Sequence, residues 1–166
     1  KNFNVNFKSL RSSMIDGYDR AKWLPSAGFT SGPCLMKDTM QLAAFNKNNF
    51  PLGHAAMILN EGLPDFIVDE LSKEFDLSKK KVGILGMTFK SNIDDIRDSL
   101  SFKLAKILEF KGAKVLCSDE FAKNKVSLSI LSKLRIAHTP SDRATKGTKF
   151  IFHAIDQLPR AYKEKI

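Results

Sequence analysis

The sequence is short of cysteine and histidine. Its 166 residues include two cysteines, Cys34 and Cys117, and three histidines, His54, His138 and His153. Two thiols cannot build the disulfide framework of a small secreted domain, and neither belongs to a C-x-x-C pair typical of zinc or redox sites. The histidines lie far apart and lack the spacing of metal ligands. The sequence therefore predicts neither a disulfide-rich domain nor a metal site.

Long hydrophobic runs are also missing. No apolar stretch reaches the roughly 20 residues that a membrane-spanning helix needs, and the first residues, Lys1-Asn2-Phe3-Asn4, contain no signal-peptide core. We therefore expect a cytoplasmic protein. Hydrophobic residues nevertheless make up 43% of the chain, enough for a packed core in one ordinary domain or two small ones.

Basic residues outnumber acidic ones, and the formal net charge is +9. Such a balance suits nucleic acid, an anionic surface or a phosphorylated small molecule. The basic residues are scattered, however, with a single run at Lys79-Lys80-Lys81 and no accompanying stripe of aromatic residues. We therefore expect a phosphate-bearing small molecule as the partner, with no nucleic acid and no membrane.

The first part of the chain shows helical periodicity. Residues 3–22 place apolar side chains at steps of three to four, and a second helix is expected over 35–47. Pro51 suits the first position of a long helix over 51–75, which Pro64 should kink or interrupt. This long helix carries a continuous apolar stripe, which indicates either core packing or a dimer face.

The pattern changes at residues 78–81, where alternating strands and helices begin. We expect a strand over 81–87, a helix from Asp98 or Ser99 to Gly112, and a parallel strand over 114–118. The remaining expected elements are a helix over 121–133, strands over 135–138 and 149–153, and a final helix over 156–165. The predicted fold is α/β: a helical segment, residues 1–77, followed by a Rossmann-like parallel domain, residues 78–166.

A cysteine stands in a glycine-bearing stretch, Gly28-Phe29-Thr30-Ser31-Gly32-Pro33-Cys34-Leu35-Met36-Lys37-Asp38. The apolar pattern from Leu35 onward predicts a helix that begins just after Cys34. A helix N-terminus stabilises a thiolate, and Asp38 lies one helical turn further along the same face. Cys34 is therefore either a nucleophile with a carboxylate beside it or an ordinary buried core thiol.

The loop after the first expected strand carries charged residues of both signs. Lys90 and Arg97 are candidates to bind phosphate oxygens. Asp94, Asp95 and Asp98 could instead neutralise both cations in a surface ion-pair cluster. The preceding strand has Gly83 and Gly86 without a full G-x-G-x-x-G, so we interpret Asp119, after the next strand, as a turn residue and not a ribose-binding acid.

Three stretches resemble the UDP-glucose/GDP-mannose dehydrogenase family. Residues 28–38 resemble its cysteine loop, G-F/V-x-G-G-x-C-x-x-K/V-D, with Ser31 in place of the first glycine of the usual pair. Residues 81–99, K-V-G-I-L-G-M-T-F-K-S-N-I-D-D-I-R-D-S, are similar to the start of its C-terminal domain. Between them, Asn60-Glu61-Gly62-Leu63-Pro64 resembles its central helical region.

The resemblance implies an activity and a set of site residues. Family members oxidise the C6 hydroxyl of a nucleotide-linked sugar to a carboxylate, using NAD. By position, Cys34 would be the nucleophile that forms a thiohemiacetal and then a thioester, and Asp38 would assist water and proton handling. Arg97 would reach the NAD pyrophosphate. The residues expected to hold the nucleotide sugar are Gly28, Phe29, Gly32, Phe89 and Lys90.

The same resemblance implies a dimer and a fragment. The segment 1–77 would provide the dimerisation and catalytic-cysteine region, with the homodimer formed through 51–75, and residues 78–166 would bind the nucleotide sugar. No G-x-G-x-x-G precedes Cys34, so the family's NAD domain has no counterpart here, and the sheet stops before its last expected strand. We therefore expect a truncated portion that cannot transfer hydride alone.

Other functions stay open on the sequence. A non-catalytic dimeric scaffold that binds nucleotide would also explain the helical and α/β parts, and a basic nucleic-acid-binding domain would explain the charge. Reactivity of Cys34 discriminates the first of these, and salt-dependent binding to DNA discriminates the second. The sequence does not specify which nucleotide sugar is oxidised.

Overall fold

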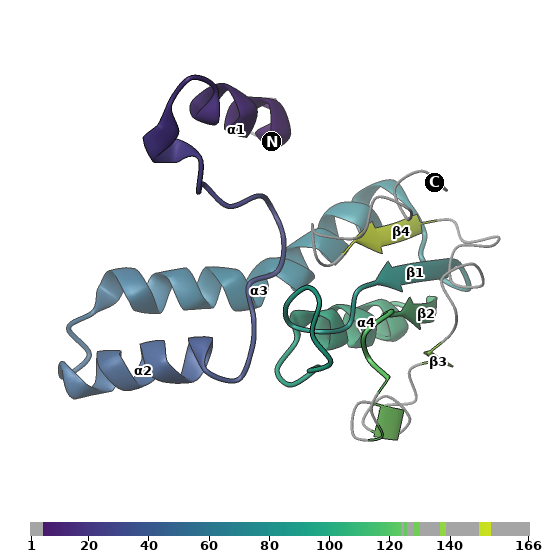
Figure 1. Cartoon of the computed structure of the whole chain (residues 1–166). Helices are drawn as coiled ribbons and strands as arrows, with labels where there is room; N and C mark the ends of the chain where they lie inside the picture. Colours follow the sequence, from purple (N-terminus) through teal and green to yellow (C-terminus); the bar gives the residue numbers. More distant parts are fainter. Residues whose placement is uncertain (1–4, 124, 126–127, 130–136, 139–149, 154–166) are drawn as a thin grey trace.

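Helices make up every described element before the first strand. The computed structural model describes residues 5–123, 125, 128–129, 137–138 and 150–153 (Figure 1). In chain order the helices of this first region are α1 (Phe7–Ile15), the 3-10 helix η1 (Asp19–Ala21), α2 (Leu35–Phe45) and α3 (Pro51–Glu74). We call residues 5–75 the helical part.

The first helix is shorter than the periodicity predicts. Asn6 caps it, its side-chain oxygen accepting a hydrogen bond from the Ser9 N–H at 3.1 Å. The helix ends at Ile15 because Gly17 takes a φ of +66°, a left-handed conformation that breaks a right-handed helix. The prediction of one helix over 3–22 is therefore wrong: α1 and η1 share that stretch.

The second and third helices form an antiparallel pair. Lys47 and Asn48 adopt positive φ values of 52° and 60° in the turn between them, and Pro51 occupies the first turn of α3. Pro64 lies inside α3 and is buried, yet the helix continues to Glu74. Figure 1 shows α3 changing direction between its two halves, as expected of a proline that removes a backbone donor.

A small parallel sheet follows. Its strands are β1 (Lys81–Leu85), β2 (Lys114–Ser118), β3 (Ala137–His138) and β4 (Phe150–His153), arranged in the order β3-β2-β1-β4. All three neighbouring pairs are parallel, and Ile84 of β1 is in register with Cys117 of β2. The predicted strand over 114–118 is confirmed with its bounds, and the one over 81–87 is confirmed but ends at Leu85. The strands predicted over 135–138 and 149–153 are confirmed at the residues described there, 137–138 and 150–153.

The helix α4 (Leu100–Phe110) connects β1 to β2. The Ser99 hydroxyl accepts a hydrogen bond from the Ser101 N–H and caps the helix. Gly112 ends the helix with a φ of +82°, and its N–H donates to the Glu109 carbonyl. Both helix ends therefore lie where the predicted N-cap and C′ residues placed them.

The hydrophobic core lies between this helix and the sheet. Its buried members include Val82, Ile84, Leu104, Leu108 and Cys117, each 0% exposed. Val68 of α3 joins the same cluster from the helical part. We call residues 77–123 together with β3 and β4 the sheet part, and α3 packs along α4 to connect the two parts.

Some predicted elements fall on residues outside those described. The expected helix over 121–133 does so for the most part, and the expected helix over 156–165 does so entirely. Within the described residues, no helix combines the length and apolar character that crossing a membrane requires.

Candidate functional site

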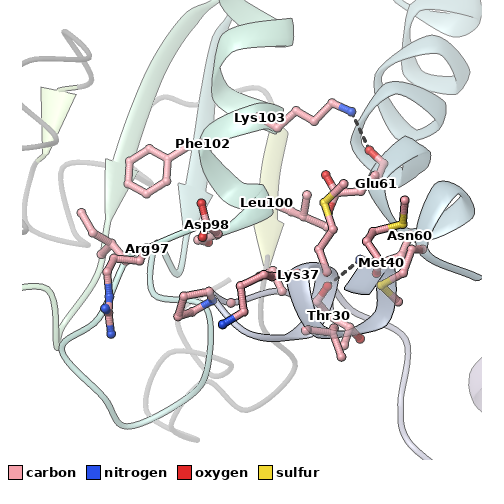
Figure 2. Close-up of a pocket in the computed structure, with 18 of the residues that line it drawn as sticks. Thr30, Lys37, Met40, Asn60, Glu61, Arg97, Asp98, Leu100, Phe102 and Lys103 are labelled. Carbon is pink, nitrogen blue, oxygen red and sulfur yellow. Dashed lines mark hydrogen bonds between the residues drawn. The ribbon is translucent and has the colours of Figure 1, made fainter. Parts of the chain in front are cut away.

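A cavity of about 950 Å³ lies where the helical part meets the sheet part (Figure 2). We call it the junction cavity. Three segments line it: residues 30–33 and 35–37 with Met40, the middle of α3, and several residues between 96 and 106, where the loop after β1 ends and α4 begins. The two motifs that the sequence analysis singled out therefore reach one cavity, although their first lining residues, Thr30 and Ile96, are 66 positions apart in the chain.

Cys34 stands at the edge of this cavity. It is the N-cap of α2 and is exposed, and its carbonyl accepts a hydrogen bond from the Asp38 N–H at 2.8 Å. Its neighbours Pro33 and Leu35 line the cavity. Of the two alternatives for this thiol, the structure excludes the buried core residue.

The other cysteine lies in the opposite environment. Cys117 is 0% exposed in the middle of β2. Burial raises the pKa of its thiol to about 12, with a smaller effect from the negative charge of Glu109. This thiol stays protonated and shielded from solvent.

Gly32 brings the cysteine loop, residues 28–34, against the loop after β1. It adopts a φ of +128°, and a Cβ added there would lie 2.7 Å from Cδ2 of the Phe89 ring. A side chain at this position would collide with that ring, so only glycine allows the contact. Two predicted site residues, Gly32 and Phe89, thus pack directly on each other.

The remaining predicted residues of the cysteine loop are arranged differently. Asp38 lies in the first turn of α2, exposed, with its Oδ1 3.3 Å from the Lys37 ammonium. Phe29 packs against the core cluster, and Gly28 is exposed. None of these three lines the junction cavity: Asp38 follows Cys34 in the first turn of α2, and Gly28 and Phe29 begin the cysteine loop.

Arg97 lines the cavity on the sheet side, where Figure 2 places it across from Asn60 and Glu61. Its Nη2 lies 2.6 Å from Oδ2 of Asp95, and its Nε donates to both oxygens of the same carboxylate. These hydrogen bonds lower the pKa of Asp95 and raise that of Arg97, and the Cys34 sulfur makes a smaller contribution to the latter. The ion-pair alternative is therefore correct for Asp95, while Arg97 still faces the cavity.

Lys90, the other predicted cation, is exposed and does not line the cavity. Its carbonyl accepts a hydrogen bond from the Thr88 hydroxyl at 2.9 Å. The basic residues that line the cavity are Lys37, Arg97, Lys103 and Lys106, against the acidic residues Glu61 and Asp98. This excess of positive charge suits an anionic ligand.

Asp119 is not the ordinary turn residue that the sequence indicates. It is buried at the end of β2, and its Oδ2 accepts the N–H groups of Met87 and Thr88 at 2.6 and 2.8 Å. Its Oδ1 accepts those of Phe121 and Ala122 at 2.8 and 3.2 Å. One carboxylate therefore fixes the start of the loop that carries Phe89, and a lone acidic residue after a strand gave no signal of that role.

Two further residues join the walls of the cavity. The side-chain amide of Asn60 donates to the Thr30 carbonyl at 2.6 Å, and the Lys103 ammonium donates to the Glu61 carbonyl at 2.6 Å; dashed lines mark both bonds in Figure 2. Sequence reasoning noted Asn60 and Glu61 as part of a resemblance but assigned them no contact. Lys103 had no signal at all.

The described residues contain no group of three or more His, Cys, Asp or Glu side chains that could hold a metal ion. Of the residues that line the cavity, one is suited to bind the pyrophosphate of a dinucleotide cofactor. Arg97 can meet a pyrophosphate with the edge of its guanidinium that Asp95 leaves open. No two glycines of the sequence are separated by a single residue, so it holds no G-x-G-x-x-G loop.

Comparisons with known proteins agree with these motifs. Residues 83–163 match the UDP-glucose/GDP-mannose dehydrogenase family, UDP binding domain. The chain is 35% identical over 125 residues to UDP-glucose 6-dehydrogenase AglM of Haloferax volcanii, covering 65% of this chain and 29% of that protein. It is 33% identical over 111 residues to UDP-N-acetyl-D-mannosamine dehydrogenase of Methanocaldococcus jannaschii, covering 67% and 26%.

The fold also matches a solved structure. A UDP-glucose dehydrogenase from Pyrobaculum islandicum superposes with a TM-score of 0.79 at 23% identity, covering 94% of this chain and 37% of that one. At that identity the likeness concerns the fold alone. The chain spans less than a third of the length of the two curated relatives, at 29% and 26%.

Proposed function

Because the chain belongs to the UDP-glucose/GDP-mannose dehydrogenase family through its UDP-binding portion, we propose that it is part of a nucleotide-sugar 6-dehydrogenase. Such an enzyme oxidises the C6 hydroxyl of the sugar to a carboxylate. One observation carries the proposal: the cysteine loop and the loop after β1 meet at a single basic cavity. An exposed thiol and a phosphate-binding surface are the two elements that this reaction needs together.

Cys34 would act as the nucleophile. Its thiolate attacks the C6 aldehyde, forming a C–S bond while the carbonyl oxygen takes up a proton, which gives a thiohemiacetal. Loss of a hydride from C6, together with loss of the hydroxyl proton to water, then turns the thiohemiacetal into a thioester. Water cleaves the C–S bond and releases the carboxylate and the free thiol. The exposure of Cys34 at the cavity edge supports this role.

Asp38 would handle the proton of that water. Its place in the first turn of α2 puts the carboxylate one turn from Cys34, on the helix whose N-terminus carries the thiol. Its Oδ1 lies 3.3 Å from the Lys37 ammonium, and a carboxylate can act as a general base toward water. Lys37 itself lines the cavity.

The nucleotide sugar would be held by both loops. Gly32, which lines the cavity, packs against the Phe89 ring, and the exposed residue Lys90 follows Phe89 and would offer its ammonium to a phosphate. Gly28 and Phe29 would support the loop from behind, since Phe29 is anchored on the core. In this arrangement residues 78–166 form the nucleotide-sugar-binding domain, and residues 1–77 supply the thiol.

Arg97 would hold the cofactor. NAD, when bound, accepts a hydride from C6 in each of the two oxidation steps. The guanidinium is oriented by its two-point contact with Asp95, and this leaves one edge to bind a pyrophosphate as a bidentate donor. The role of this chain in cofactor binding is therefore to supply a positioned cation.

The helical part would also form a homodimer through α3. This helix exposes Leu52 by 80%, Leu59 by 75% and Phe66 by 58%. Exposed apolar side chains on one long helix are typical of a protein interface. Sedimentation of the full chain tests this directly, and a monomeric mass across micromolar concentrations would contradict it.

Alkylation of Cys34 tests the catalytic proposal. We expect the C6 aldehyde of UDP-glucose to slow the reaction of Cys34 with iodoacetamide by at least about tenfold, since thiohemiacetal formation removes the thiolate. UDP-xylose, the same nucleotide sugar without the C6 carbon, serves as the control and should give weaker protection at equal occupancy. Cys117 is too buried to interfere.

The outcomes separate the possibilities. Equal protection by both ligands would leave a nucleotide-sugar-binding scaffold without a nucleophile. If calorimetry detects binding of neither UDP-glucose nor UDP-xylose, the nucleotide-sugar assignment itself fails.

A further inference from the structure

Asn60 is the side chain of α3 that reaches the cysteine loop. Its Nδ2 donates to the Thr30 carbonyl at 2.6 Å, across 30 residues of chain. Thr30 lies four residues before Cys34 and two before Gly32, which packs on Phe89. A hydrogen bond to a backbone carbonyl at this point fixes the path of the loop just before the thiol.

The turn of α3 that carries Asn60 is also bound by a side chain of α4. The Lys103 ammonium, from α4, donates to the Glu61 carbonyl at 2.6 Å and lies 3.0 Å from Oδ2 of Asp65. Pro64 has no N–H to donate and interrupts the backbone ladder at this turn of the helix. The carbonyl that Pro64 leaves without a helical donor is that of Asn60, and Lys103 donates to the next carbonyl, that of Glu61.

These contacts close a ring around the junction cavity. Asn60 connects the cysteine loop to α3, Lys103 connects α3 to α4, and the Gly32–Phe89 contact connects the loop after β1 back to the cysteine loop. Asn60 and Glu61 are consecutive, so both polar contacts act on one turn of α3. The width of the cavity between Cys34 and the sheet side therefore depends on this turn.

We propose that Asn60 is a positioning residue that holds the Cys34 loop at the sugar end of the cavity, with Lys103 fixing the turn of α3 from which it acts. This rests on the function proposed above. Asn60 need not touch the substrate. It sets where the loop presents the thiol, and the nucleotide end of the ligand lies against other residues.

Asn60→Asp provides a sharp test because the change is isosteric. A carboxylate cannot donate to the Thr30 carbonyl and repels its oxygen, whereas a protonated carboxyl can donate again. Loss of one such bond corresponds to about tenfold in affinity. At pH 7.5 we expect UDP-glucose to bind about tenfold more weakly than to the unaltered chain, while UDP changes by less than about twofold.

The pH dependence separates positioning from general damage. We expect the loss of UDP-glucose affinity, relative to the unaltered chain at the same pH, to shrink between pH 7.5 and about pH 4, as the introduced carboxyl takes up a proton near its ordinary pKa. Gln41→Glu makes the same amide-to-carboxylate change on the exposed face of α2. It should leave both affinities unchanged at both pH values.

Lys103→Met gives a second route if the first variant does not fold. Methionine keeps the stem of the side chain and removes the donor, so it should also weaken UDP-glucose more than UDP. Equal losses for the two ligands, or no loss for either, would overturn the positioning role. If the unaltered chain binds neither ligand, the proposed function fails instead. In that case, amide hydrogen exchange of residues 30–34, compared between the unaltered chain and Asn60→Asp, still reports whether Asn60 orders the loop.

Discussion

The two parts of the chain treat their apolar residues in opposite ways. Sixteen of the eighteen large hydrophobic side chains that are exposed in the described residues lie at or before Phe75. In the core cluster, by contrast, eleven of the thirteen buried members lie at or after Val82. The helical part therefore leaves its apolar side chains uncovered, while the sheet part buries its own.

This difference indicates what each part needs in order to be stable. The sheet part has a core of its own, in which α4 covers β1 and β2. The helical part contributes Val68 to that core and otherwise buries Ala43 and Pro64 among its described helices. A helical region of this kind gains most of its stability from what packs against it. The following predictions test the contrast, beginning with the largest effect.

The largest expected difference between the two parts is in the rate at which their cysteines, Cys34 and Cys117, react with an alkylating reagent. Cys34 is exposed, whereas Cys117 is buried and its pKa is raised to about 12, so that at pH 8 the Cys117 thiol is almost wholly protonated. We expect iodoacetamide to modify Cys34 at least about 1000-fold faster than Cys117 in the folded chain. Peptide mass spectrometry over a time course measures both rates, and equal rates would remove the contrast.

Burial of Cys117 also predicts a dependence of stability on pH. The folded chain raises the pKa of this thiol to about 12, so the unfolded chain releases its proton first. The stability that results is full below about pH 8.5 and declines as pH rises toward 12. Cys117→Ala should flatten this decline in a urea titration, and an unchanged slope would argue against a buried neutral thiol.

A pair of leucines tests the burial contrast directly. Leu104 of α4 is 0% exposed and Leu59 of α3 is 75% exposed. Leu104→Ala should lower the free energy of unfolding by about 3 kcal/mol through the cavity it leaves, and Leu59→Ala by less than about 0.5 kcal/mol. Urea denaturation at low protein concentration measures both. A large cost at Leu59 that grows with protein concentration would place this surface in an interface.

The same contrast explains how far the fold could be predicted. In the sheet part, the strand bounds, the Ser99 cap and Gly112 each followed from local patterns that burial reinforces. In the helical part, the stretch 3–22 split at Gly17, because no core contact forces α1 to continue past a left-handed glycine. Apolar periodicity predicts a structure well where a partner face exists for it.

In the candidate site, the positions of single residues could be predicted from the sequence, but the contacts between them could not. Arg97 lines the cavity and Cys34 lies beside it, between the lining residues Pro33 and Leu35, because local sequence placed both a loop before a helix and a loop after a strand. The contacts that join them could not be predicted. Asn60 bonds to Thr30 across 30 residues, and Asp119 bonds to Thr88 across 31. Such pairings depend on the packing of whole elements, for which a single sequence carries no signal.

Asp119 tests how much burial adds to the stabilisation that a carboxylate gives by accepting backbone hydrogen bonds. Asp119→Asn replaces one oxygen with a donor that faces backbone N–H groups in a buried site. We expect a loss of about 2 kcal/mol in the free energy of unfolding, because two buried donors lose their acceptor. Asp76→Asn is the matched control, since its Oδ1 accepts one exposed N–H, that of Ser78. Equal losses at both positions would show that burial adds nothing to this carboxylate.

The smallest effect concerns the ion pair between Asp95 and Arg97, which belongs to the sheet part but is exposed to solvent. The Arg97 side chain is 65% exposed, so solvent screens the pair and it adds little to stability. Its hydrogen bonds lower the pKa of Asp95; the folded chain therefore holds this proton less tightly than the unfolded one. The small stabilisation is present above about pH 4 and is lost as pH falls through the lowered value. Arg97→Met should return the pKa of Asp95, followed by NMR, toward its ordinary value. An unchanged pKa of Asp95 in the variant would mean that the guanidinium of Arg97 does not pair with Asp95 in solution and is available to bind a phosphate.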